Sequence, residues 1–116
     1  MDMILNEGEK IFVVTRRLFE KDLRRHFVGE VMASTQVSVR AQGYSFVFDD
    51  SQNEFLRRDD VRTRIISLAD AGIVINLLPN EVDLSAVKYA ADSQNNRIIT
   101  DGKSFSMNIS EFGLRR

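Results

Sequence analysis

A chain of 116 residues with 43% hydrophobic and 28% charged residues has the composition of one globular domain. We expect a single domain over residues 1–116, with residues 1–9 as a candidate flexible segment. The formal net charge of -1 argues against a strongly nucleic-acid-seeking protein, and the lack of cysteine excludes disulfides and thiolate chemistry. The sequence shows neither a signal-peptide pattern nor an apolar run of the roughly 20 residues that span a bilayer, so we expect a cytoplasmic protein without a membrane segment.

The first half of the chain is rich in residues that favour strands. A β-branched and aromatic run predicts a strand over residues 10–18. Two further strands, over 26–34 and 37–50, are expected to form a hairpin across a short polar break. Residues 18–25 carry apolar side chains spaced by four. This spacing is compatible with either a short helix or a turn.

The apolar alternation of the third strand changes phase at Gly43. Apolar side chains occupy odd-numbered positions before this glycine and even-numbered positions after it: Val37, Val39 and Ala41, then Tyr44, Phe46 and Phe48. Because a strand alternates with period two, we interpret the change as a β-bulge near Gln42 and Gly43 that returns all six side chains to one face. A bulged strand bends, so the pattern predicts a small barrel or a rolled sheet.

The second half predicts more short strands, over residues 55–56, 62–68, 72–78, 87–90, 97–100 and 104–109. Their apolar content marks 62–68 and 72–78 as central strands, and the last three segments are expected to form a meander. Asp83 is expected to cap a helical turn, and Asp101-Gly102 is typical of a short hairpin turn.

These elements predict a mainly β fold: a small single-domain barrel or rolled antiparallel sheet with a glycine-bent strand and at most short helices. The alternative is an α+β fold, in which residues 18–25 or 80–88 form packed helices. Small barrels with bent strands include the Sm-like and OB-like folds. The comparison is one of architecture, since no signature residues of either fold can be matched.

Acid–base or metal chemistry near neutral pH would have to use His26, the single histidine. Arg24 and Arg25 precede it and would repel a cation, so we interpret His26 as a strand-edge or loop residue without a catalytic role. The acidic run 49–54 offers oxygen ligands but lacks the glycine turn of a calcium loop. We expect no catalytic residue, no cofactor and no metal site.

Aromatic side chains at Tyr44, Phe46 and Phe48 could form a stacking platform for a single-stranded nucleic acid. Three aromatic residues along one strand are also the stripe that fills a small β core. We favour the core interpretation, because the stripe continues the apolar pattern that precedes it.

Arginine is used three times as often as lysine, with twelve residues against four. Its planar guanidinium group can hold a phosphate or carboxylate by two hydrogen bonds. The candidate binding residues are Arg24, Arg25, Arg40, Arg57, Arg58, Arg62 and Arg64. Neighbouring acidic residues such as Asp59 and Asp60 can pair with them, and we favour an ion-paired surface.

The leading functional hypothesis is a non-enzymatic binding or assembly module that acts through protein contacts and forms homo-oligomers. Its physical basis is that a small open sheet presents unpaired strand edges to another chain. A module that binds RNA or another single-stranded nucleic acid through the arginine residues is the alternative. A third possibility is an enzyme or a protein that binds a small anion.

Overall fold

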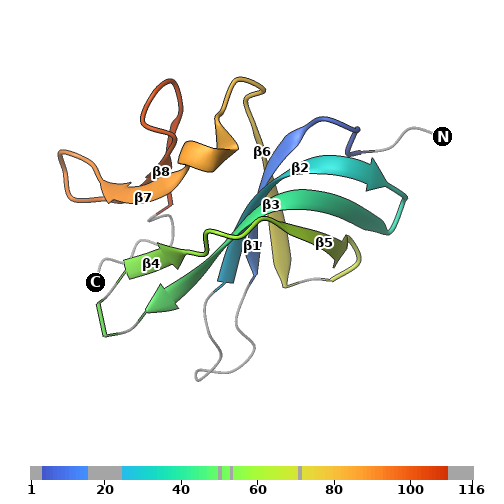
Figure 1. Ribbon diagram of the computed structural model, residues 1–116, viewed down its shortest axis with the longest axis horizontal. Coiled ribbons are helices and arrows are strands. Elements are labelled where there is room, and N and C mark those ends of the chain that lie inside the picture. Colours follow the sequence, from blue (N-terminus) through green and yellow to red (C-terminus); the bar gives the residue numbers. More distant parts are fainter. Residues whose placement is uncertain (1–3, 16–24, 50, 53, 71, 110–116) are drawn as a thin grey trace.

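The computed structural model describes residues 4–15, 25–49, 51–52, 54–70 and 72–109, which form two antiparallel sheets (Figure 1). The larger sheet contains β1 (Lys10–Thr15), β2 (Arg25–Ser34), β3 (Ser38–Asp49), β4 (Glu54–Arg57), β5 (Arg62–Ser67) and β6 (Ile73–Leu78). After β6 the chain forms a 3₁₀ turn, η1 (Leu84–Ala86), and then the smaller sheet of β7 (Lys88–Ala91), β8 (Arg97–Thr100) and β9 (Ser106–Asn108). The prediction of a mainly β fold is confirmed.

The larger sheet is open. Its strand order is β4-β3-β2-β1-β6, and β5 also pairs with β3. Strands β5 and β4 share one edge of β3, where β5 pairs with residues 38–43 and β4 pairs with residues 46–49. Among the described strands, β6 pairs with β1 alone, so the sheet does not close into a barrel.

The expected hairpin of β2 and β3 is present, but the predicted bulge at Gly43 is wrong. Gly43 lies directly opposite Gly29, and the β3 register continues unbroken on both sides of this pair. The register shift lies in β2 instead, between Val31 and Ala33. The phase change of β3 therefore has another cause, which is a change in the face of the sheet that is covered.

Two apolar cores lie on opposite faces of the larger sheet, because successive side chains of a strand point to opposite faces. The intersheet core, between the two sheets, contains Phe12, Val28, Phe46, Phe48, Phe55, Leu78, Val82, Val87 and Ile99. The first-sheet core, on the other face, contains Leu5, Ile11, Val13, Phe27, Val31, Val39 and Ala41. Strand β3 thus contributes its first half to one core and its second half to the other.

Strands β5 and β6 are edge strands, which corrects the prediction that residues 62–68 and 72–78 are central. Ile65 of β5 is 70% exposed and Leu77 of β6 is 58% exposed. In β6, Leu78 belongs to the intersheet core while Ile73 and Ile75 pack against the first-sheet core, and in β5 Ile66 packs against the first-sheet core.

The prediction that Asp83 caps a helical turn is confirmed, since its side chain accepts a hydrogen bond from the Ser85 N–H at the start of η1. The predicted meander is also present as β7, β8 and β9. Its second turn is longer than Asp101-Gly102 alone, because residues 101–105 connect β8 to β9. The described residues contain no α-helix, and residues 18–24 of one candidate helix lie outside them.

Candidate interaction surface

Arg57 and Arg62, two of the candidate binding arginines, are held by contacts with other segments or with an acidic neighbour. The Arg57 guanidinium lies over the Tyr44 ring, 5.1 Å from its centroid, and donates to the carbonyl oxygens of Ser85 and Val87. Arg57 therefore ties β4 to the segment that leads into the smaller sheet. Arg62 forms an ion pair with Asp60 at 2.7 Å.

The Asp60 carboxylate is stabilised in its charged form. Its own backbone N–H, and then the Arg62 guanidinium, hold the pKa of Asp60 below its usual value. The expectation that acidic neighbours pair with these arginines is met at Arg62, and the 3.8 Å ion pair of Arg57 with Asp59 is a second case.

The remaining candidate arginines do not converge on one surface. Arg64 lies opposite Ala41, on the face of the first-sheet core, and donates to the Ser45 hydroxyl at 3.2 Å. Arg40 is exposed and lies on the opposite face, because it neighbours Ala41 in the same strand. Arg25 and Arg58 are exposed, and Arg24 lies outside the described residues. The described arginines are thus divided between the two faces of the sheet.

His26 lies in an aromatic cluster between the sheets. The sequence-based interpretation of His26 as a strand-edge or loop residue is therefore wrong. Its ring stacks on Phe55 at 4.3 Å and meets Phe12 edge-on at 5.3 Å. The Nδ1 atom of His26 forms a hydrogen bond with the Tyr89 hydroxyl. Burial raises the pKa of Tyr89, and Arg97 opposes this effect only in part, so the hydroxyl stays protonated at neutral pH.

The aromatic residues of β3 lie in the interior, which confirms the core interpretation. Phe46 is 1% exposed and Phe48 is 9% exposed, and both belong to the intersheet core. Tyr44 is half-buried beneath Arg57. These three rings are therefore not presented as an open stacking platform.

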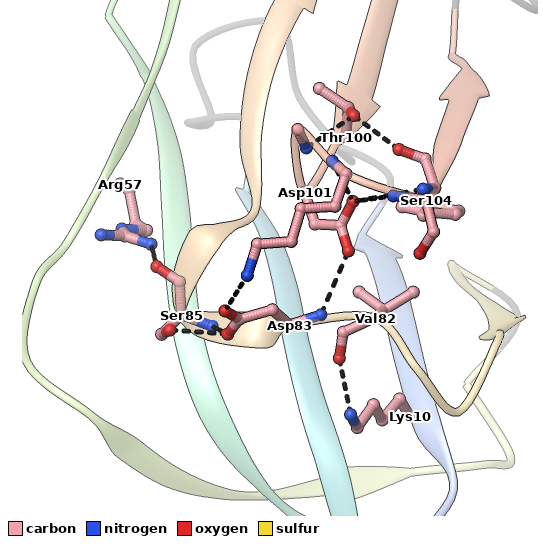
Figure 2. A network of polar contacts seen from close by, with 11 residues as sticks. Lys10, Arg57, Val82, Asp83, Ser85, Thr100, Asp101 and Ser104 are labelled. Atoms are coloured by element: carbon pink, nitrogen blue, oxygen red, sulfur yellow. Dashed lines mark hydrogen bonds and ion pairs between the residues drawn. The ribbon is translucent and has the colours of Figure 1, made fainter.

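A polar network around Asp101 holds the β8–β9 loop, and Figure 2 shows it from close by. The buried Asp101 carboxylate accepts hydrogen bonds from the backbone N–H groups of Lys103, Ser104, Phe105 and Asp83. These donors, with Lys103 as the strongest, hold the pKa of Asp101 below its usual value. The sequence indicated a turn here, but not this set of bonds.

Asp83 continues the network toward β4 and β1. The Ser85 hydroxyl and the Lys103 ammonium, 3.1 Å away, lower the pKa of Asp83 to about 2. Lys10 of β1 donates to the Val82 carbonyl oxygen at 2.5 Å (Figure 2). The two carboxylates thus hold the segment around η1 against the β8–β9 loop. The described residues contain no group of three or more potential metal ligands.

An apolar surface that the sequence analysis missed lies at the other end of the larger sheet. The outer strand β6 has half-exposed Val74 and Leu77, and no charged residue occurs between Ile73 and Leu78. Beside it, a groove of about 560 Å³ is lined by Ile4, Leu5, Thr35, Gln36, Ser67, Leu68, Asp70, Ile73, Ile75 and Leu77. The uncharged run 73–78 was the available sequence signal, but it was interpreted as a sign of a central strand.

Comparisons with protein-family models, with curated proteins and with solved structures found no match to this chain. No helix in the described parts of the chain has the length and apolar character needed to cross a membrane.

Proposed function

We propose that this chain is a non-enzymatic assembly module that associates with a second copy of itself through the open edge of β6. The observation that carries the proposal is that β6 is an uncharged, apolar strand which, among the described strands, has a partner on one side only. An edge strand of this kind leaves backbone N–H and C=O groups that another strand can pair with.

Both faces of β6 contribute apolar surface to this edge. Val74 lies opposite Val14 and Leu77 lies opposite Ile11, so their side chains point to different faces of the sheet. They are 59% and 58% exposed, respectively. An added strand would cover both side chains and extend the backbone hydrogen bonding of the sheet.

The charge pattern favours β6 over β5 as the contact between identical copies. A two-fold contact places the same strand of each copy against the other. Strand β5 carries Arg62 and Arg64, and like charges across paired strands are destabilising. Strand β6 contains no charge that would oppose the pairing.

An RNA- or anion-binding function has less support from the geometry. The described arginines face both sides of the sheet, and Arg57 and Arg62 already have partners within the chain. Their guanidinium groups would have to leave these partners to contact phosphate.

Sedimentation velocity over a range of protein concentrations tests the proposal. We expect the wild-type chain to self-associate, and we expect Val74→Lys and Leu77→Lys to shift the equilibrium toward monomer. Val37→Lys and Val61→Lys are matched controls, because these valines are also more than half exposed but lie outside β6. A wild-type chain that remains monomeric at every concentration, or equal effects of all four substitutions, would contradict the proposal.

A further inference from the structure

The apolar groove beside β6 opens directly onto the first-sheet core. Leu5 belongs to this core and lines the groove, and Leu68, Ile73 and Ile75 line the groove while they pack against the same core. The groove has a volume of about 560 Å³, and protein sites for small molecules span roughly 300 to 1,000 Å³. Its floor therefore offers an apolar surface of the size that a small organic ligand requires.

A single carboxylate supplies the charge of the groove. Among the described residues that line it, Asp70 alone is charged, and the other polar residues carry hydroxyl or amide groups. Arg64 lies on the same face of the sheet, but its guanidinium donates to the Ser45 hydroxyl, and neither residue lines the groove. An anionic ligand would thus meet a like charge in the groove, whereas a cationic ligand would meet an opposite one.

The Asp70 carboxylate is held beside the start of β6. Its Oδ1 atom accepts a hydrogen bond of 2.7 Å from the Gly72 N–H, and the Asp70 carbonyl oxygen accepts one of 3.3 Å from the Ile73 N–H. Within the described part of the chain, neither a hydrogen bond nor an ion pair engages the other carboxylate oxygen, Oδ2. Because Asp70 is exposed, a cation can pair with Oδ2 without displacing a partner in the chain.

We propose that this groove binds a small amphipathic cation, of which a protonated alkylamine is the simplest form. The alkyl chain lies on the apolar floor, and the ammonium group donates a charge-assisted hydrogen bond to Oδ2 of Asp70. A fatty acid has the same apolar body with the wrong charge, and a long-chain alcohol has no charge. One copy of the chain provides the whole site, so this inference does not depend on assembly through β6.

Three ligands with the same alkyl chain test the charge preference: octylammonium, octanol and octanoate. At pH 7 the amine is protonated, because its pKa is close to that of lysine, about 10.4. In NMR titrations we expect octylammonium to bind about fivefold more tightly than octanol, which is the upper range for an exposed ion pair, and octanoate to bind more weakly than octanol. Equal affinities for the three ligands, or no binding of any of them, would overturn the proposal.

Asp70→Asn tests the role of the carboxylate, because it removes the charge and keeps the oxygen that accepts from the Gly72 N–H. We expect this variant to bind octylammonium no more tightly than octanol, while its affinity for octanol stays at the wild-type value. Asp59→Asn is the matched control, since Asp59 is also an exposed carboxylate but does not line the groove. An unchanged preference in Asp70→Asn, or an equal loss in Asp59→Asn, would overturn the proposal.

A second pair of substitutions locates the alkyl chain. Leu77→Ser removes apolar surface from the groove, and we expect it to weaken the binding of octylammonium and octanol alike, by about threefold. Val74→Ser is the matched control, because Val74 is 59% exposed against 58% for Leu77 but lies on the other face of β6. Equal losses of ligand affinity in the two variants would overturn binding in the groove.

The amide signals of residues beside the groove identify its occupant. At low protein concentration, the signals of Leu68, Asp70 and Ile73 are expected to shift as octylammonium is added. Signals that respond to protein concentration alone, and not to octylammonium, would overturn the proposal and assign the groove to a second copy of the chain.

Discussion

Gly29 and Gly43 lie opposite each other on β2 and β3, and the two backbones approach so closely that a side chain on Gly43 has no room. A Cβ atom on Gly43 would lie 1.9 Å from the Val28 carbonyl oxygen and 2.6 Å from Cα of Gly29. A Cβ atom on Gly29 would meet the Phe27 ring at 2.6 Å. The glycine at position 43 is therefore explained by backbone contact, and not by a bulge or a positive φ.

Gly43→Ala is expected to destabilise the fold by about 2 kcal/mol or more, because backbone atoms must move to admit the methyl group. Gly29→Ala should cost less, since the Phe27 ring can shift. Urea unfolding curves measure both values. If Gly43→Ala and Gly43→Val kept the wild-type midpoint and slope, the close approach of β2 and β3 would be disproved.

The phase change in β3 shows what local sequence can and cannot predict. The positions of nearly all described strands followed from β-branched and aromatic runs and from polar turns, which are local signals. A phase change, however, fits either a bulge or a change of covered face. The choice depends on whether a second sheet covers Phe46 and Phe48, and residues far away in the sequence, such as Val87 and Ile99, provide that cover.

The candidate interaction surface was missed for a related reason. Apolar composition alone does not distinguish a central strand from an edge strand, because pairing with distant strands decides it. The candidate arginines were visible in the sequence, but the face on which each guanidinium lies depends on register. Arg40 and Arg64 lie on paired strands and still point to opposite faces.

Phe46→Ala is expected to lower the free energy of unfolding by about 3 to 5 kcal/mol, the usual cost of removing a buried aromatic ring. Phe48→Ala should fall in the same range, because both rings belong to the intersheet core. Phe46→Leu is the control and should cost less, since it keeps most of the apolar volume. Chemical denaturation measures these costs, and wild-type stability of both alanine variants would refute the core assignment.

Tyr89→Phe is expected to cost about 1 kcal/mol, because it removes the hydroxyl partner of His26 and keeps the ring that stacks on Phe55 at 4.6 Å. Tyr89→Ala should cost more, since it also removes the stacking. Thermal unfolding of the two variants separates the hydrogen bond from the ring contact. An equal loss in both would show that the ring contributes nothing to the joint between the sheets.

Acid is expected to weaken the loop network of Asp83 and Asp101. Both carboxyl groups have a lowered pKa in the folded chain, so their stabilisation is complete above the unfolded value of about 3.9 and is lost as the pH falls toward 2. Asp101→Asn should therefore lower the melting temperature at pH 7. The difference in melting temperature between this variant and the wild type should become smaller as the pH falls. Asp59→Asn is the control at an exposed ion pair, and its melting temperature at pH 7 should be close to that of the wild type. A difference that widens in acid would contradict this role of Asp101.

Binding of generic single-stranded RNA is expected to be weak or undetectable at physiological ionic strength. The net charge of -1 gives no long-range attraction, and Asp60 already pairs with one of the candidate arginines. Fluorescence anisotropy at several salt concentrations tests this, since each phosphate contact on a single strand adds a slope of about -0.7 in logarithmic units. Arg25→Glu with Arg64→Glu reverses the charge of two cations on the face of the first-sheet core, and Arg40→Glu is the control on the opposite face. The wild-type chain could instead bind RNA with micromolar or tighter affinity, and the double variant could lose this binding while it keeps its fold and Arg40→Glu has no effect. This result would contradict the assembly proposal and support RNA binding.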